Sequence, residues 1–145
     1  MTEGNAPDPA RPQDPDRLIA EFAERVPGVL RAAVVASDGV LVAVSGRIRP
    51  DDQEQLSAIT AGLMSLAWAA AGMLDNGAVT QALVTMARST LVIMTVGHGS
   101  SLAVLTTATA DLDLVAYEMT MLAEQAGSIF TPPARRAVRD NGSPA

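Results

Sequence analysis

The chain has 145 residues, a mass of 15.0 kDa and a net charge of −6 at pH 7, and it contains neither cysteine nor lysine. This length is enough for one domain with a buried core. The missing cysteine excludes disulfides and thiolate metal sites, and the missing lysine excludes a P-loop and Schiff-base chemistry. An acidic balance without a strong basic patch also argues against a nucleic-acid-binding protein.

The two ends of the chain differ in composition from its middle. Residues 1–13 are polar and proline-rich, which predicts a disordered leader without a secretory signal. Residues 14–130 carry the apolar patterns of a folded domain, and residues 131–145 are expected to form a tail that is partly helical or disordered. We therefore expect a cytoplasmic protein that partners are able to recruit to a membrane.

The first predicted elements are a helix and a hairpin. Asp14 suits the N-cap of an amphipathic helix, Pro15 its first helical position, and Pro27-Gly28 its end. Residues 29–36 and 40–45 then have the composition of strands on either side of an Asp-Gly turn, which predicts a β-hairpin.

A long helix is predicted from Pro50 to the stop signal Asn76-Gly77, and its run from Leu56 to Leu74 carries no charge. Because it is apolar on nearly every side, it must be covered on two faces. The bulky aliphatic face is expected to lie on the protein's own sheet and comprises Leu56, Ile59, Leu63, Ala67, Ala70 and Leu74. The face of smaller residues is expected to meet a second copy of the chain and comprises Ser57, Ala61, Met64, Trp68 and Ala71.

A membrane span is the alternative interpretation of this run, because its nineteen residues meet the length criterion. The run is rich in Ala, Gly and Ser rather than in Leu, Ile and Phe, and strand-like segments follow it directly. Direct membrane insertion is therefore the weaker hypothesis.

Three further strands and a last helix complete the pattern. Residues 78–86, 90–96 and 101–107 are strand-like and joined by short connections, so they should form an antiparallel meander. Asp111 is a suitable cap for a helix that ends near Gly127. The order helix, two strands, long helix, three strands, helix predicts an α+β fold with a five-stranded antiparallel sheet.

The sequence contains few candidates for catalytic or metal-binding residues. His98, the only histidine, lies in a glycine turn near Ser100, but this turn joins two strands, whereas a nucleophile elbow joins a strand to a helix. One histidine without cysteine makes a metal site improbable. The pairs Asp51/Asp52 and Asp111/Asp113 open helices, where negative charge is stabilising in any case. We therefore predict no catalytic residue, no cofactor and no metal, so the protein is expected not to be an enzyme.

Arg88 is a candidate for a role in trans. It lies at a predicted hairpin tip, from which an arginine finger could reach a partner's phosphate site. Its alternative interpretation is a solubilising tip residue. Arg47 and Arg49, on the loop before the long helix, have the same standing.

The pattern as a whole resembles the Roadblock/LC7 family, and within it the short actinobacterial proteins encoded beside small Ras-like GTPases. The resemblance extends over residues 15–130. It is carried by Val26-Pro-Gly-Val29 leading into Arg31-Ala-Ala-Val-Val, the hairpin Ser37-Asp-Gly-Val-Leu-Val-Ala, residues 52–66 of the long helix, residues 90–105 and residues 110–119.

The resemblance implies how two copies pair. Family members usually join their sheets through the strand after the long helix, while the two long helices pack side by side. In this chain the implied strand seam comprises Val79, Gln81, Leu83 and Thr85. The implied helix seam comprises Ser57, Ala61, Met64, Trp68 and Ala71.

The resemblance also implies a function. Family members bind small GTPases as dimeric platforms, and some raise GTP hydrolysis without catalytic residues of their own. We therefore expect a non-enzymatic homodimeric module that binds a small Ras-like GTPase, is able to stimulate its GTP hydrolysis, and has a sensor-kinase-like protein as a further partner. The alternative is a purely structural dimerisation adaptor with no effect on nucleotide turnover. The expected GTPase-binding residues are Arg49, Asp52 and Arg88.

Overall fold

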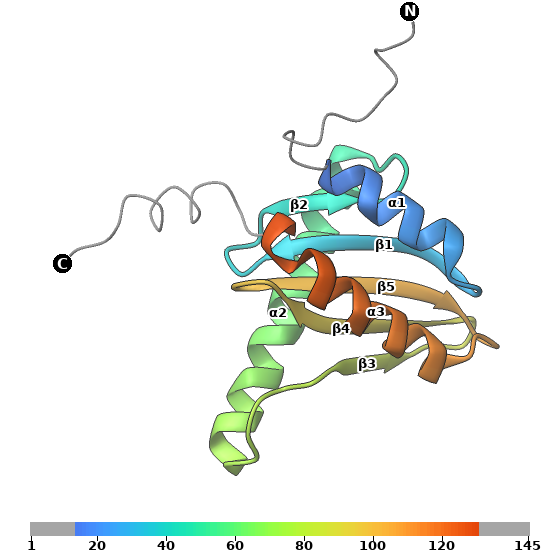
Figure 1. Cartoon of the computed structure of the whole chain (residues 1–145). Coiled ribbons are helices and arrows are strands. Elements are labelled where there is room, and N and C mark those ends of the chain that lie inside the picture. Colours follow the sequence, from blue (N-terminus) through green and yellow to red (C-terminus); the bar gives the residue numbers. More distant parts are fainter. Residues whose placement is uncertain (1–13, 131–145) are drawn as a thin grey trace, which may run out of the picture.

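The structure is a computed structural model that describes residues 14–130, so the predicted leader and tail lie outside the described residues. One five-stranded sheet has the order β2-β1-β5-β4-β3, and every pair of neighbours is antiparallel. Helices α1 and α3 cover one face of this sheet, and α2 lies on the other (Figure 1). The predicted α+β fold is confirmed. The strands are β1 (Val29–Ala36), β2 (Leu41–Val44), β3 (Ala82–Thr85), β4 (Ser89–Val96) and β5 (Ser100–Thr107).

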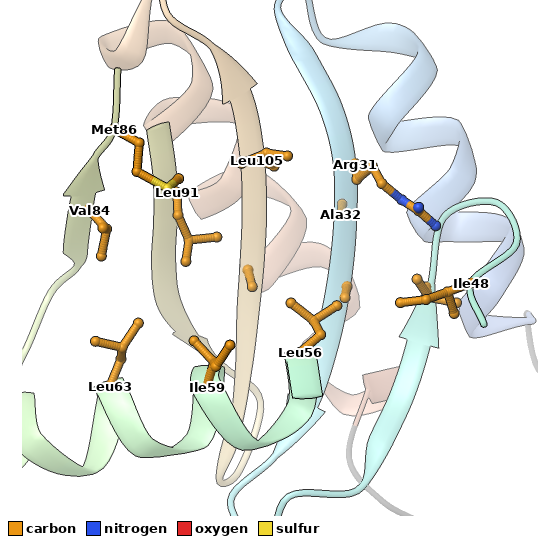
Figure 2. A pocket seen from close by; sticks show the side chains of 13 residues that line it. Arg31, Ala32, Ile48, Leu56, Ile59, Leu63, Val84, Met86, Leu91 and Leu105 are labelled. Carbon is orange, nitrogen blue, oxygen red and sulfur yellow. The ribbon is translucent and has the colours of Figure 1, made fainter. Parts of the chain in front are cut away.

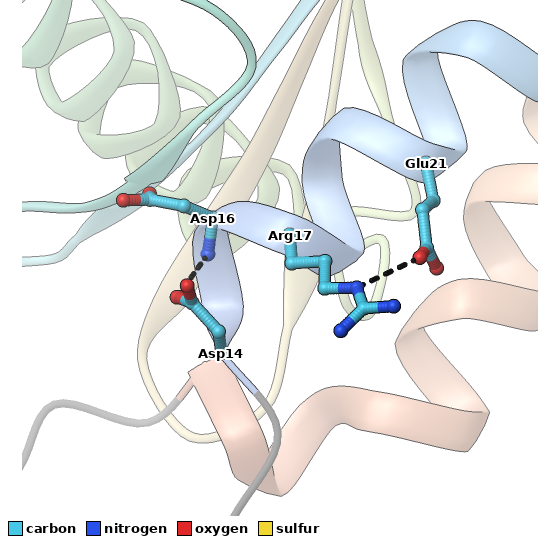
Figure 3. Close-up of polar contacts among 4 residues, drawn as sticks. All are labelled: Asp14, Asp16, Arg17 and Glu21. Atoms are coloured by element: carbon cyan, nitrogen blue, oxygen red, sulfur yellow. Dashed lines mark hydrogen bonds and ion pairs between the residues drawn. The ribbon is translucent and has the colours of Figure 1, made fainter. Parts of the chain in front are cut away.

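Two helices begin where their capping residues predict. In α1 (Pro15–Arg25) the Asp16 N–H donates to Oδ1 of Asp14 over 3.1 Å (Figure 3). The same helix carries an exposed ion pair between Arg17 and Glu21, one turn apart. In α3 (Leu112–Ala126) the Leu114 N–H donates to Oδ1 of Asp111 over 3.2 Å. Each cap satisfies a backbone N–H that has no partner within the helix.

The side chains of the strands alternate between two unlike faces. Val34, Leu102 and Met94 form one cross-strand row under α1 and α3, where they join the main hydrophobic core. The next row, on the α2 face, is mostly small and comprises Ala33, Ala103, Ile93 and Ala82. The α2 face is therefore shallow, and a helix can approach it closely.

The main core fills the space between the sheet and the α1/α3 layer. Ile19 and Phe22 of α1 and Val115 and Met119 of α3 are fully buried there. Phe130, in the 3-10 turn η2 (Gly127–Phe130) after α3, closes the same core. The stability of the domain thus comes mainly from one face of the sheet.

On the other face α2 (Pro50–Leu74) begins at the predicted Pro50 and ends just before the predicted stop signal Asn76-Gly77. Asp75 adopts a left-handed conformation with φ 53° and terminates the helix. The strand that follows is shorter than predicted, because only Ala82–Thr85 pair with β4, whereas residues 78–86 were expected to be strand.

Candidate functional site

Helix α2 is unusually exposed for an apolar helix. Only Ser57, Thr60 and Met64 of its 25 residues are buried, whereas Leu66 is 71% and Met73 is 79% exposed. Among the described residues it is also the one helix that is long and apolar enough to cross a membrane. Its middle nevertheless packs on the sheet through the cluster of Met64, Ile93 and Ala103. An exposed apolar surface of this size marks an interaction site.

The second half of α2 extends past the edge of the sheet at β3 (Figure 1). Its 25 residues give a length of roughly 37 Å, while the axes of five strands span roughly 19 Å. Trp68 and Ala71 follow Met64 at helical spacing, so they lie on the sheet-facing side of α2. Trp68 is still 45% exposed, in contrast to Met64, which is buried. Because the last buried residue of α2 is Met64, which packs on β4 and β5, we call residues 67–74, which follow it and include no buried residue, the overhang.

A groove runs along α2 on the side of the sheet that the helix leaves open (Figure 2). It has a volume of about 460 Å³. Among the described residues, Arg31 of β1 is the only charged residue that lines it. Its apolar lining includes Leu56, Ile59 and Leu63 of α2 and Val84, Leu91 and Leu105 of the sheet. The groove has the size and lining of a binding cleft.

The edge strand β3 presents backbone groups to solvent. The Met86 N–H donates to the Ser89 carbonyl at the hairpin end, so the N–H groups of Val84 and Ala82 also point toward β4. The alternate residues Leu83 and Thr85 therefore direct their N–H and carbonyl groups to the open side of β3. Such an edge can pair with a strand from another chain.

Most of the described region matches one family of proteins. A model of the Roadblock/LC7 domain matches residues 16–106. A solved Roadblock/LC7 domain from Streptomyces avermitilis is 34% identical, covers 79% of this chain and 95% of its own, and superposes with a TM-score of 0.73. This chain belongs to the Roadblock/LC7 family.

More distant structures share the Roadblock/LC7 fold. MglB from Myxococcus xanthus is 18% identical, with 79% of this chain and 93% of that chain covered and a TM-score of 0.71. The gliding protein MglB from Thermus thermophilus is 20% identical, with 83% and 97% covered and a TM-score of 0.66. A comparison with curated proteins finds no match.

The helix residues predicted for a Roadblock/LC7 dimer seam divide into two groups. Ser57 and Met64 are buried within the protomer, which leaves them little surface for a second copy, and their role in self-association stays a prediction. Of the residues predicted to lie on the sheet, Leu63 packs against the Met64 cluster, whereas Leu56 and Ile59 line the open groove. The sheet-facing side of α2 therefore takes residues from both predicted faces, because the alanines beneath it accommodate Met64 closely. The remaining predicted helix residues, Ala61, Trp68 and Ala71, retain exposed surface.

The predicted strand seam also retains exposed surface. Gln81, Leu83 and Thr85 are exposed, and Val79 is half-buried against the α2 cluster. Leu83 and Thr85 belong to β3, whereas Val79 and Gln81 precede it. All four therefore lie before or within the edge strand, and their role in self-association stays a prediction.

The predicted GTPase-binding residues border the groove. Arg49 is the exposed N-cap residue of α2 and follows Ile48, which lines the groove. Asp52 is exposed one turn before Leu56 on the same side of the helix. Arg88 is exposed in the turn between β3 and β4, which is flanked by the lining residues Met86 and Leu91.

Sequence reasoning did not single out Arg31. Its signal is a charged residue at the start of an otherwise apolar strand, Arg31-Ala-Ala-Val-Val. In the structure Nη2 of Arg31 donates to the carbonyls of Ser45 and Arg47, over 3.1 and 2.7 Å. The guanidinium is thereby fixed beside the loop that leads into α2.

One polar residue considered for hydrolysis, Ser100, has a structural role. Ser100 is buried, and its hydroxyl donates to the Phe130 carbonyl over 3.1 Å. This bond ties η2 to the sheet and makes Ser100 a structural residue. Within residues 14–130 there is also no group of three or more His, Cys, Asp or Glu residues placed to hold a metal ion.

Proposed function

We propose that this Roadblock/LC7 protein is a non-enzymatic homodimeric regulatory module that binds a small Ras-like GTPase, of the kind encoded beside such GTPases in actinobacteria. The proposed setting is a cytoplasmic signalling complex that partners recruit to the membrane and that includes a sensor-kinase-like protein. The observation that carries the proposal is the combination of an exposed apolar α2 with an open β3 edge on the same side of the domain. The family resemblance supplies the class of partner.

Self-association explains the overhang. A second copy added through β3 would continue the sheet beneath residues 67–74, so that Trp68 and Ala71 meet sheet instead of solvent. The two overhangs would then run in opposite directions along the two α2 helices, since an isologous pair has a two-fold axis. One related protein, MglB, has been solved in a tetrameric arrangement.

The GTPase would bind to a surface without catalytic groups of its own. The groove and its borders offer apolar area together with Arg49, Asp52 and Arg88, and these residues are candidates for contact rather than for chemistry. A platform of this kind accelerates hydrolysis if it binds the productive arrangement of the GTPase switch loops more tightly than other arrangements. The size of the acceleration is limited by that difference in affinity.

Single-turnover GTP hydrolysis tests the proposal. The small Ras-like GTPase encoded nearest to this gene is loaded with GTP, and hydrolysis is followed with and without an excess of this protein, with a binding assay on the same samples. We expect binding and faster hydrolysis. Binding without acceleration would favour the dimerisation adaptor, in which the protein only assembles its partners. Absence of binding across the small Ras-like GTPases of the same genome would overturn the proposal.

A further inference from the structure

The guanidinium of Arg31 is held in place by hydrogen bonds to the described residues from only one of its three nitrogen atoms. Both hydrogen bonds of its side chain leave from Nη2, toward the carbonyls of Ser45 and Arg47. Within residues 14–130 no carboxylate lies within 4.0 Å of it, because the ion pairs there are Arg17–Glu21 and Arg25–Glu118. Toward the described residues Nε and Nη1 make no hydrogen bond, so they can donate to an acceptor from a partner. A fixed guanidinium binds a carboxylate strongly, because its planar fork can donate two parallel hydrogen bonds.

Apolar side chains surround this guanidinium. Leu105 of β5 is the direct cross-strand neighbour of Arg31. Ile48 and Leu56 lie at the same end of the groove (Figure 2). We call these four residues the Arg31 end of the groove. It combines one cation with a surface for a bulky apolar side chain.

A second copy of the chain would not reach the Arg31 end. The overhang has eight residues, 67–74, and is therefore roughly 12 Å long. One further strand spacing of about 5 Å separates β3 from its copy, which leaves about 7 Å over the neighbouring sheet. Strand β1 lies three spacings from β3, or about 14 Å. The overhang of a partner therefore ends before Arg31.

We propose that the Arg31 end of the groove holds the GTPase partner, through a carboxylate side chain bound to Arg31 and an adjacent bulky apolar side chain packed on Leu56 and Leu105. This inference rests on the proposed function and assigns the contact within it. The basic residues Arg47 and Arg49 lie on the same loop and favour an acidic partner surface. Asp52 is exposed one turn before Leu56 on the same side of the helix, so we expect the carboxylate to approach from the β1 side.

Two variants test the contact in different ways. Arg31→Gln removes the charge. Leu105→Glu leaves Arg31 and its bonds to the loop intact but places a carboxylate directly opposite it, where it neutralises the guanidinium and fills the apolar surface. Arg17→Gln is the matched control, because Arg17 is an exposed arginine on α1, on the other face of the sheet. Binding of the GTP-loaded small Ras-like GTPases of the same genome is measured with wild type and all three variants.

We expect Arg31→Gln and Leu105→Glu each to weaken binding about tenfold or more, as for an anchoring residue of an interface. Arg17→Gln should bind as wild type, and all variants should keep the wild-type oligomeric state. If wild type binds and both groove variants bind equally well, the Arg31 contact is wrong while the proposed function stands. If wild type binds none of the GTPases, both are overturned.

Discussion

Gly28 lies against Ala110, at the point where the chain enters β1. A Cβ added to Gly28 would lie 2.6 Å from the Cβ of Ala110, and the backbone of Gly28 has φ +88°. The Thr107 N–H donates to the Gly28 carbonyl over 2.9 Å, which fixes this close approach. Position 28 therefore excludes side chains for two independent reasons, one steric and one conformational.

Gly28→Ala should destabilise the domain more than Gly39→Ala. Gly39 has the same φ of +88° but no atom within 4 Å of its virtual Cβ. The left-handed backbone should cost each variant about 1 kcal/mol, and the overlap with Ala110 should cost Gly28→Ala about 1 to 3 kcal/mol more. Urea unfolding of the two variants measures the difference. Equal losses would show that the α3 entry relaxes freely around position 28.

Ser57→Ala and Thr60→Val should stabilise the protein by about 1 kcal/mol each. Both side chains are buried between α2 and the sheet, and within residues 14–130 their hydroxyls have no hydrogen-bond partner. Ser45→Ala is the opposite case, because the Ser45 hydroxyl accepts from the Ala32 N–H over 2.9 Å.

Thermal unfolding of these three variants gives the sign of each effect. Ser45→Ala should destabilise by about 1 to 3 kcal/mol, since it leaves a buried N–H without this partner. A loss of stability in Ser57→Ala or Thr60→Val would mean that these hydroxyls bond to a buried water.

The elements and their caps could be predicted because their signals are local. Asp14 and Asp111 act on N–H groups two and three residues away, and the Asp38-Gly39 turn closes its own hairpin. The central pairing of β1 with β5 has no such signal, since it joins residues about 70 positions apart in sequence. The strand order therefore had to come from the structure.

The faces of α2 could not be ranked from the sequence, because both are apolar at helical spacing. What decides between them is the surface underneath, where Ala33, Ala82 and Ala103 leave room for the Met64 side of the helix. That surface is assembled from three strands, so the sequence of the helix alone gives no information about it. For the same reason the sequence could not show that Arg31 is a candidate binding residue. Its neighbours on β5 and on the loop before α2 are known only from the fold.

Trp68→Arg should convert the proposed dimer into a folded monomer. Trp68 lies on the overhang and is 45% exposed, so the domain core should tolerate the charge. Val40→Arg is the control, because Val40 is similarly exposed in the β1–β2 turn at the opposite edge of the sheet. Light scattering after size exclusion measures the mass. A dimer that survives Trp68→Arg would exclude the overhang from the interface.

Thr85→Pro should weaken self-association while the domain stays folded. The Thr85 N–H points away from β4, so proline removes a donor at the open edge and none within the sheet. Val84→Pro removes an N–H that points toward β4 and should lower the melting temperature further. Sedimentation at several concentrations gives the dimer constant. If Thr85→Pro dimerises as wild type, the copies do not join through β3.

Arg88→Ala should lower the affinity for the GTPase severalfold and change the hydrolysis rate at saturation by less than tenfold. Arg88 is exposed in the turn beside the groove, within reach of a bound partner. In the proposed mechanism it contributes to binding and not to the transition state. An arginine finger would instead be worth about 10³-fold or more in rate. Single-turnover hydrolysis at saturating protein separates the two effects, with Arg17→Ala on the far face as control. A loss of that larger size would make Arg88 a finger, and no change in either quantity would remove it from the contact surface.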